Sequence, residues 1–161
     1  MGAEIGQKNE WDANGQVDWW LLEAGPYHVG VQRFLRDLNG LYRKYAAFWE
    51  GDHDPRGFQW IDCADHENSV LSFLRRPLNP GREFVIVLNL TPVVRKNYRV
   101  GLPRGGYWTE VLNTDATVYG GSNQGNAGGV HAESVPAHQQ QFSARLALPP
   151  LGVVVLGSEG P

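Results

Sequence analysis

The sequence of 161 residues contains a single cysteine, Cys63, so no disulfide can form within the chain. Such cysteine usage is typical of proteins in a reducing compartment, and we expect a cytoplasmic location. No run approaches the roughly 18 consecutive apolar residues that a membrane-spanning helix needs. The first residues also lack the basic and then apolar pattern of a signal peptide. We therefore expect no membrane partner.

The chain also lacks a strong charge of either sign. It has 14 Lys and Arg against 17 Asp and Glu, a formal net charge of −3, and the basic residues do not cluster. A protein whose main partner is nucleic acid normally carries a basic patch that contacts phosphates, so we expect no nucleic-acid partner. Hydrophobic residues at 42% and charged residues at 19% are values of a globular domain.

What the chain has in quantity is turn residues, with 20 Gly and 10 Pro, which favours many short strands over a bundle of helices. One helical pattern stands out before residue 50. Apolar residues recur there at spacings of three and four and form a single stripe: Val31, Phe34, Leu35, Leu38, Leu41, Tyr42 and Tyr45. The spacing predicts a helix over residues 28–45.

The residues after about 58 form a series of short β patterns at roughly ten-residue intervals, which predicts an antiparallel sandwich. The segments 69–75 and 83–90 flank a short Pro-Gly loop and predict a hairpin. The segments 98–102 and 108–112 flank Pro-Arg-Gly-Gly and predict a second hairpin. Segment 83–90 is almost continuously apolar, as expected of a strand buried on both faces. Residues 119–129 are predicted to form a loop.

Candidate catalytic or metal-binding residues are few. Glu4, Glu10 and Asp12 could supply a pair of carboxylates for glycosidase-type chemistry, or they are solvated loop acids. His53 and His66 lie near several acids, but their spacing matches no ligand motif. We therefore expect no metal site and no cofactor.

Tryptophan offers a better indication of function, because its face can stack on the apolar face of a sugar ring. Trp11, Trp60 and Trp108 each have polar neighbours in the sequence and are candidates for such contacts. The alternative is that each packs in a core or between domains. From the residues alone, the prediction is one helix and a β-sandwich in which carbohydrate contact is possible.

Several strings, in the same order, resemble bacterial 1,4-α-glucan (glycogen) branching enzymes of the α-amylase superfamily. The resemblance covers essentially the whole chain and rests on GAEIGQKNEW, VDWWLLE, GVQRFLRDLNGLYR, GFQWID, NSVLSFLRR, NLTPV, YRVGLP, EVLNTDA, YGGSNQGNAGG and LALPPLGVVVL.

The resemblance implies that the chain is a C-terminal fragment of such an enzyme. Residues 1–50 would be the remnant of the catalytic (β/α)8 barrel, comprising the loop after strand eight and the last helix. Residues 51–161 would be the C-terminal all-β sandwich. Members of the family transfer α-1,4-glucan segments to 6-hydroxyls and so form α-1,6 branches in glycogen. The Asp, Glu and Asp that catalyse this reaction lie on earlier strands, and no string here matches them, so we assign no catalytic residue.

The resemblance also implies partners and substrate contacts. Glu4, Gln7, Glu10 and Trp11 match the loop after the last strand of the barrel, and they would border the groove that holds the glucan. The expected partners are α-glucan or glycogen and the missing catalytic barrel, with possible self-association through the exposed barrel remnant. The alternative is a stand-alone glucan-binding β-sandwich, in which Trp60 and Trp108 would contact sugar.

Overall fold

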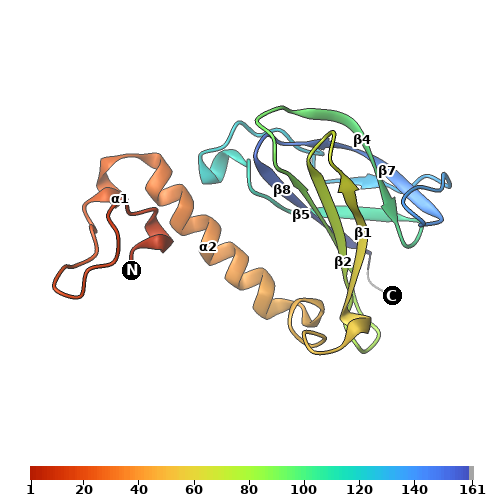
Figure 1. The fold of residues 1–161 in the computed structure, drawn as a ribbon, viewed down its shortest axis with the longest axis horizontal. Coiled ribbons are helices and arrows are strands. Elements are labelled where there is room, and N and C mark those ends of the chain that lie inside the picture. The colour runs from red at the N-terminus through yellow and green to blue at the C-terminus, as the bar shows by residue number, and fades with distance from the viewer. Residues whose placement is uncertain (160–161) are drawn as a thin grey trace.

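A helical N-terminal part precedes eight strands in the computed structural model, which describes residues 1–159 (Figure 1). The helices are α1 (Leu21–Ala24) and α2 (Pro26–Lys44), with short 3-10 turns at Ala3–Ile5, Ala46–Phe48, Pro55–Gly57 and Thr117–Tyr119. The strands are β1 (Phe58–Asp65), β2 (Val70–Arg75), β3 (Phe84–Asn89), β4 (Arg95–Leu102), β5 (Tyr107–Asn113), β6 (Gly129–His131), β7 (Phe142–Leu148) and β8 (Gly152–Ser158).

The strands form two sheets. The larger has the order β1-β2-β3-β8-β5-β6 and the smaller consists of β4 and β7, and all these neighbours are antiparallel. Alternate residues of each strand point between the sheets. There Val85, Val87 and Leu156 of the larger sheet pack with Val100 and Leu146 of the smaller. The mainly β, antiparallel fold expected from the sequence is therefore confirmed.

One predicted hairpin is confirmed and the other is wrong. Strands β2 and β3 pair in regular register from Val70 opposite Asn89 to Arg75 opposite Phe84. In contrast, β4 pairs with β7, whereas β5 pairs with β6 and β8 in the other sheet. The connection 103–106 passes from one layer to the other. Each of the two strands buries one side in the core that the sheets share, and this explains the alternation of apolar residues in both segments. The same alternation would occur in a hairpin within one sheet, so the pattern does not distinguish a hairpin from a crossing between sheets.

Helix α2 covers part of the outer face of the larger sheet. The helix begins at Pro26, and the N–H that proline lacks would have no partner within the helix at this position. Basic residues occupy the last turn, where they interact favourably with the negative end of the helix dipole. Its apolar stripe, formed by Phe34, Leu38, Leu41 and Tyr45, packs on Phe84, Ile86, Leu112 and Val155. Strand β3 is consequently buried on both faces, as its composition predicted.

The first 25 residues form an arm that packs on the start of α2 and lies away from the sandwich (Figure 1). Ile5 and Leu21 are its buried apolar side chains. The loop before β6 connects this end of α2 to the sandwich, because Arg33 donates to the Val118 carbonyl and the Tyr119 hydroxyl bonds to the Asp37 carboxylate. Of the helices described, none has the length and hydropathy required to cross a bilayer.

Candidate functional site

The arm brings together four of the residues singled out in the sequence. The turn at Ala3–Ile5 depends on Gly2, which has a left-handed conformation (φ of 81°) and sits so close to Gln7 that a β-carbon would collide with that side chain. Ile5 is fully buried, and this fixes the neighbouring Glu4 on the exposed side of the turn. Glu10 and Trp11 follow in the exposed part of the arm, where 69% of Trp11 is accessible.

Gln7 closes the arm on itself. Its Oε1 accepts a hydrogen bond of 2.9 Å from the Asp18 backbone N–H, and its Nε2 donates to the Asn9 carbonyl at 3.3 Å. Asn9 also donates to the Asp18 carboxylate at 3.0 Å. The side chain of Gln7 is therefore engaged in holding the loop 7–18, whereas Glu4 and Glu10 remain exposed.

His28 attaches the arm to α2, a role that the sequence did not indicate. Its Nδ1 lies 2.7 Å from the Ile5 carbonyl oxygen, and because a carbonyl only accepts, Nδ1 carries the hydrogen. The bond joins residues 23 positions apart, so it defines where the turn 3–5 lies against the helix. No local periodicity could reveal such a pair.

Trp60 lies on the outer face of β1 in an aromatic cluster. Its ring centroid is 5.1 Å from that of Phe58 and 5.9 Å from that of Phe73, both at nearly perpendicular angles. Half of Trp60 remains exposed, and Phe58 is also exposed. The sequence held a signal for this cluster, since Phe58 and Trp60 are two positions apart on a strand and so share a face.

Trp108 does not lie on a surface, which corrects the expectation that it contacts sugar. Its side chain is fully buried between the two sheets, and its indole Nε1 donates to the Arg104 carbonyl at 3.3 Å. The indole therefore has no exposed face on which a sugar ring could stack. The polar neighbours Tyr107 and Thr109 point to the opposite side of β5, as alternate residues of a strand do.

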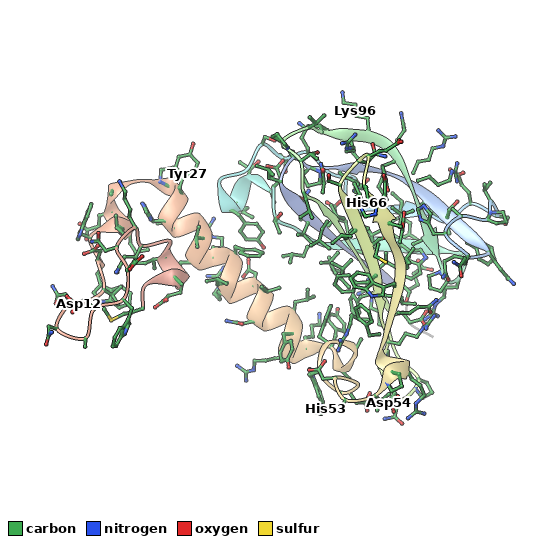
Figure 2. The ribbon with its side chains drawn as sticks, in the orientation of Figure 1. Asp12, Tyr27, His53, Asp54, His66 and Lys96 are labelled. Carbon is green, nitrogen blue, oxygen red and sulfur yellow. The ribbon has the colours of Figure 1, made fainter. Side chains whose placement is uncertain are left out.

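The arm and Trp60 are separate surfaces. The 19 residues of α2 span about 28 Å at 1.5 Å per residue, with the arm at the start of the helix. The chain enters β1 only after the end of α2. In Figure 2, Asp12 lies at the tip of the arm, whereas Asp54, a few residues before β1, lies beyond the other end of α2. The structure thus brings Glu4, Gln7, Glu10 and Trp11 together, but not Trp60 with them.

The glycine-rich loop 119–129 is held by two carboxylates, those of Asp115 and, through Asn126, of Glu110. Asp115 accepts hydrogen bonds from the Ser122 and Gln124 backbone N–H groups and from the Ser122 hydroxyl, at 2.7–2.9 Å. Partial burial tends to raise the pKa of Asp115, but these donors outweigh it and lower the pKa from its ordinary value of 3.8. These hydrogen bonds hold residues 122–124 of the loop close to the end of β5.

The histidines that neighbour acids in the sequence lie apart. His53 is in the loop before β1, and His66 is in the turn after it (Figure 2). Among residues 1–159, no three His, Cys, Asp or Glu side chains gather in a way that could hold a metal ion.

The chain is similar to one protein family and to several known proteins. Residues 60–159 match the family described as alpha amylase, C-terminal all-beta domain. The chain is similar to the 1,4-alpha-glucan branching enzyme GlgB of Aromatoleum aromaticum, at 53% identity over 97% of this chain and 24% of that protein. It is similar to GlgB of Aquifex aeolicus, at 50% identity over 99% of this chain and 25% of that protein. It resembles a structure of the trehalulose synthase MutB, at 19% identity and a TM-score of 0.48, over 91% of this chain and 24% of that one.

The chain spans about a quarter of the length of the curated relatives it matches. It corresponds to the C-terminal part of these branching enzymes, since most of it matches a C-terminal domain family.

Proposed function

Since this chain belongs to the alpha amylase C-terminal all-beta domain family, we propose that it works as the C-terminal part of a 1,4-α-glucan branching enzyme. The observation that carries the proposal is the identity of 50–53% to two such enzymes over almost the whole chain. The whole enzyme would transfer α-1,4-glucan segments to 6-hydroxyls and form the α-1,6 branches of glycogen. Residues 1–50 would belong to its catalytic barrel and residues 51–161 to its C-terminal domain.

Within that enzyme, the chain has a structural and glucan-contacting role without catalysis. Retaining glycoside chemistry needs two carboxyl groups about 5–5.5 Å apart across the scissile bond. The sequence strings that would carry the catalytic Asp, Glu and Asp of this family are not in the chain. The reaction would therefore be carried out by residues of the preceding barrel.

The arm would form part of the wall of the glucan groove. Glu4, Glu10 and Trp11 are exposed there, and Gln7 holds the loop that presents them. The bond between His28 and Ile5 supports this role, because it holds the arm in a defined position before any ligand binds.

The helix and arm would also join the sandwich to the catalytic barrel. Trp19, Trp20 and Tyr27 expose large apolar side chains at the end of α2 that projects beyond the sandwich. Exposed aromatic surface of this kind favours an interface. In the isolated chain, the same surface would promote self-association. We also propose a cytoplasmic location, which the single exposed Cys63 supports.

A chimera tests the proposal. The matched C-terminal segment of the Aromatoleum aromaticum enzyme would be replaced by this chain, and amylose branching would be measured. The chimera is expected to branch amylose, whereas the relative lacking its C-terminal segment is expected to lose activity or fail to fold. A chimera that folds with the thermal stability of the native relative and yet forms no branches would contradict the proposal.

A second candidate function is a glucan-binding sandwich that acts alone, and the exposure of Trp60 favours it. Electrophoresis of the chain through gels containing glycogen tests it. Retardation should be lost in Trp60→Ala and kept in Trp49→Ala, a control with similar exposure, 46% against 50%. Migration that glycogen does not retard would dismiss this candidate.

A further inference from the structure

One row of apolar side chains crosses the outer face of the larger sheet. The pairing registers place Leu112, Val155, Ile86, Phe73 and Trp60 opposite one another on β5, β8, β3, β2 and β1. The first three are buried beneath α2, Phe73 is half-buried, and Trp60 is half-exposed. Exposure therefore rises along the row as its distance from α2 increases.

A second row and a groove extend this apolar surface. Leu71, Leu88 and Val153 face each other on β2, β3 and β8, and all three are partly exposed. An open groove of about 400 Å³ runs beside α2 over β3 and β8, and its lining is almost entirely apolar. Ile86 lines this groove and pairs with Phe73, so the groove borders the Trp60 end of the row.

The sheet is wide enough for one more helix. Four interstrand steps separate β5 from β1, or about 19 Å at 4.8 Å each, whereas a helix is about 10 Å in diameter. Helices packed side by side lie 8–10 Å apart. With α2 above β8, a neighbouring helix would lie above β2, with Phe73 beneath it and Leu88 and Trp60 on either side.

We propose that this uncovered surface, formed by Phe58, Trp60, Leu71, Phe73 and Leu88, docks a second amphipathic helix of the same polypeptide beside α2. This inference rests on the proposed function, because the helix must come from the part of a branching enzyme that these 161 residues do not include. The relatives are about four times as long as the chain, which leaves ample polypeptide to supply it. The site also continues an existing interface, that of α2 with the sheet.

The chemistry of the surface favours a helix over a sugar. A sugar needs hydrogen-bonding groups around its rim as well as an aromatic face. The neighbours of Trp60 in the two rows are aromatic or aliphatic, and Phe58 and Phe73 pack nearly perpendicular or tilted to each other and to Trp60 rather than as one flat platform. Aliphatic side chains of a helix fill such an uneven apolar surface well.

Hydroxyl-radical footprinting of the isolated chain and of the chimera described above tests the inference. Oxidation of Trp60 and Phe58 is expected to fall at least ~5-fold in the chimera without glucan, because docked side chains lose access to solvent. His66, in the turn outside the surface, is the control and should react equally in both proteins. Trp60 that is as reactive in the chimera as in the isolated chain would overturn the inference, as would protection that appears only when maltoheptaose is added.

A substitution gives an independent measurement. Trp60→Glu should change the Tm of the isolated chain by less than ~2 °C but lower that of the chimera by ~5 °C or more, since only there would the charge be buried. Val93→Glu, at a site 55% exposed in the loop after β3, should leave both Tm values unchanged. Equal effects of Trp60→Glu on the two proteins would contradict docking. A chimera that folds and branches amylose while Trp60 stays exposed would contradict only this inference. A chimera that folds without forming branches would contradict the proposed function.

Discussion

At the scale of single residues, Trp60 on β1 and Trp108 on β5 show how the same side chain takes opposite roles in two strands of one sheet. Trp108 fills the space between the sheets and is fully buried, whereas Trp60 stands half-exposed on the outer face. Their sequence neighbourhoods are alike, with polar residues next to each. Which face of a strand is buried depends on the strands that pair with it. Those strands are far away in the sequence, so the local sequence does not reveal the buried face.

We predict that truncating these two tryptophans to alanine lowers the free energy of unfolding by very different amounts. Trp108→Ala should destabilise the isolated chain by about 3–5 kcal/mol, because it leaves a large cavity in the core. Trp60→Ala should cost less than about 1 kcal/mol, the loss of its aromatic contacts alone. Urea unfolding followed by circular dichroism measures both free energies. Equal losses would mean that Trp108 is not the core residue the structure shows.

Asp115 gives a prediction that depends on pH. Asp115→Asn should lower the free energy of unfolding by about 1–3 kcal/mol at pH 7, because an amide cannot replace a carboxylate that accepts three hydrogen bonds. The pKa of Asp115 is lowered in the folded chain, so its stabilisation is complete above the ordinary value of 3.8 and is lost as the pH falls through the lower folded value.

Unfolding of Asp115→Asn and the unmodified chain, measured between pH 3 and pH 7, checks the sign. The difference between the two proteins should shrink at the acidic end. A difference that grows on acidification would show that the carboxylate is not the stabilising form.

At the scale of elements, the glycines of α2 provide a matched pair. A β-carbon at Gly40 would meet nothing within 4 Å, so Gly40→Ala should stabilise the chain by about 0.5–1 kcal/mol through helix propensity alone. A β-carbon at Gly30 would collide with the Tyr119 carbonyl oxygen, so Gly30→Ala should destabilise the chain despite the same gain in propensity. Thermal unfolding distinguishes the two variants. If both substitutions stabilised the chain, this would contradict the contact between α2 and the loop 117–120.

The elements themselves were largely predictable, because periodicity is local. The stripe from Phe34 to Tyr45 identified α2 within two residues at its start and one at its end, and the apolar run 83–90 identified the doubly buried β3. The connection between β4 and β5 was not predictable, since a hairpin and a crossing between layers present the same alternation. The bond between His28 and Ile5 likewise could not be foreseen, because it joins segments with no shared period.

At the scale of the whole molecule, the sandwich, α2 and the arm form a connected series. The sandwich supports one half of α2, and the other half carries the arm with Glu4, Gln7 and Trp11. This arrangement fits a part that holds a loop at the edge of a glucan groove while other polypeptide performs the chemistry. It leaves aromatic surface exposed at both the arm and β1, where that polypeptide would dock.

The most direct test is to incubate the purified 161-residue chain with amylose and to count α-1,6 linkages by proton NMR, with an intact branching enzyme as the positive control. We predict no new α-1,6 signal from the chain at any concentration, because the proposed function assigns the carboxyl groups that form a glucosyl-enzyme to the preceding barrel. New α-1,6 linkages that increase in proportion to the concentration of the chain would contradict the proposed non-catalytic role.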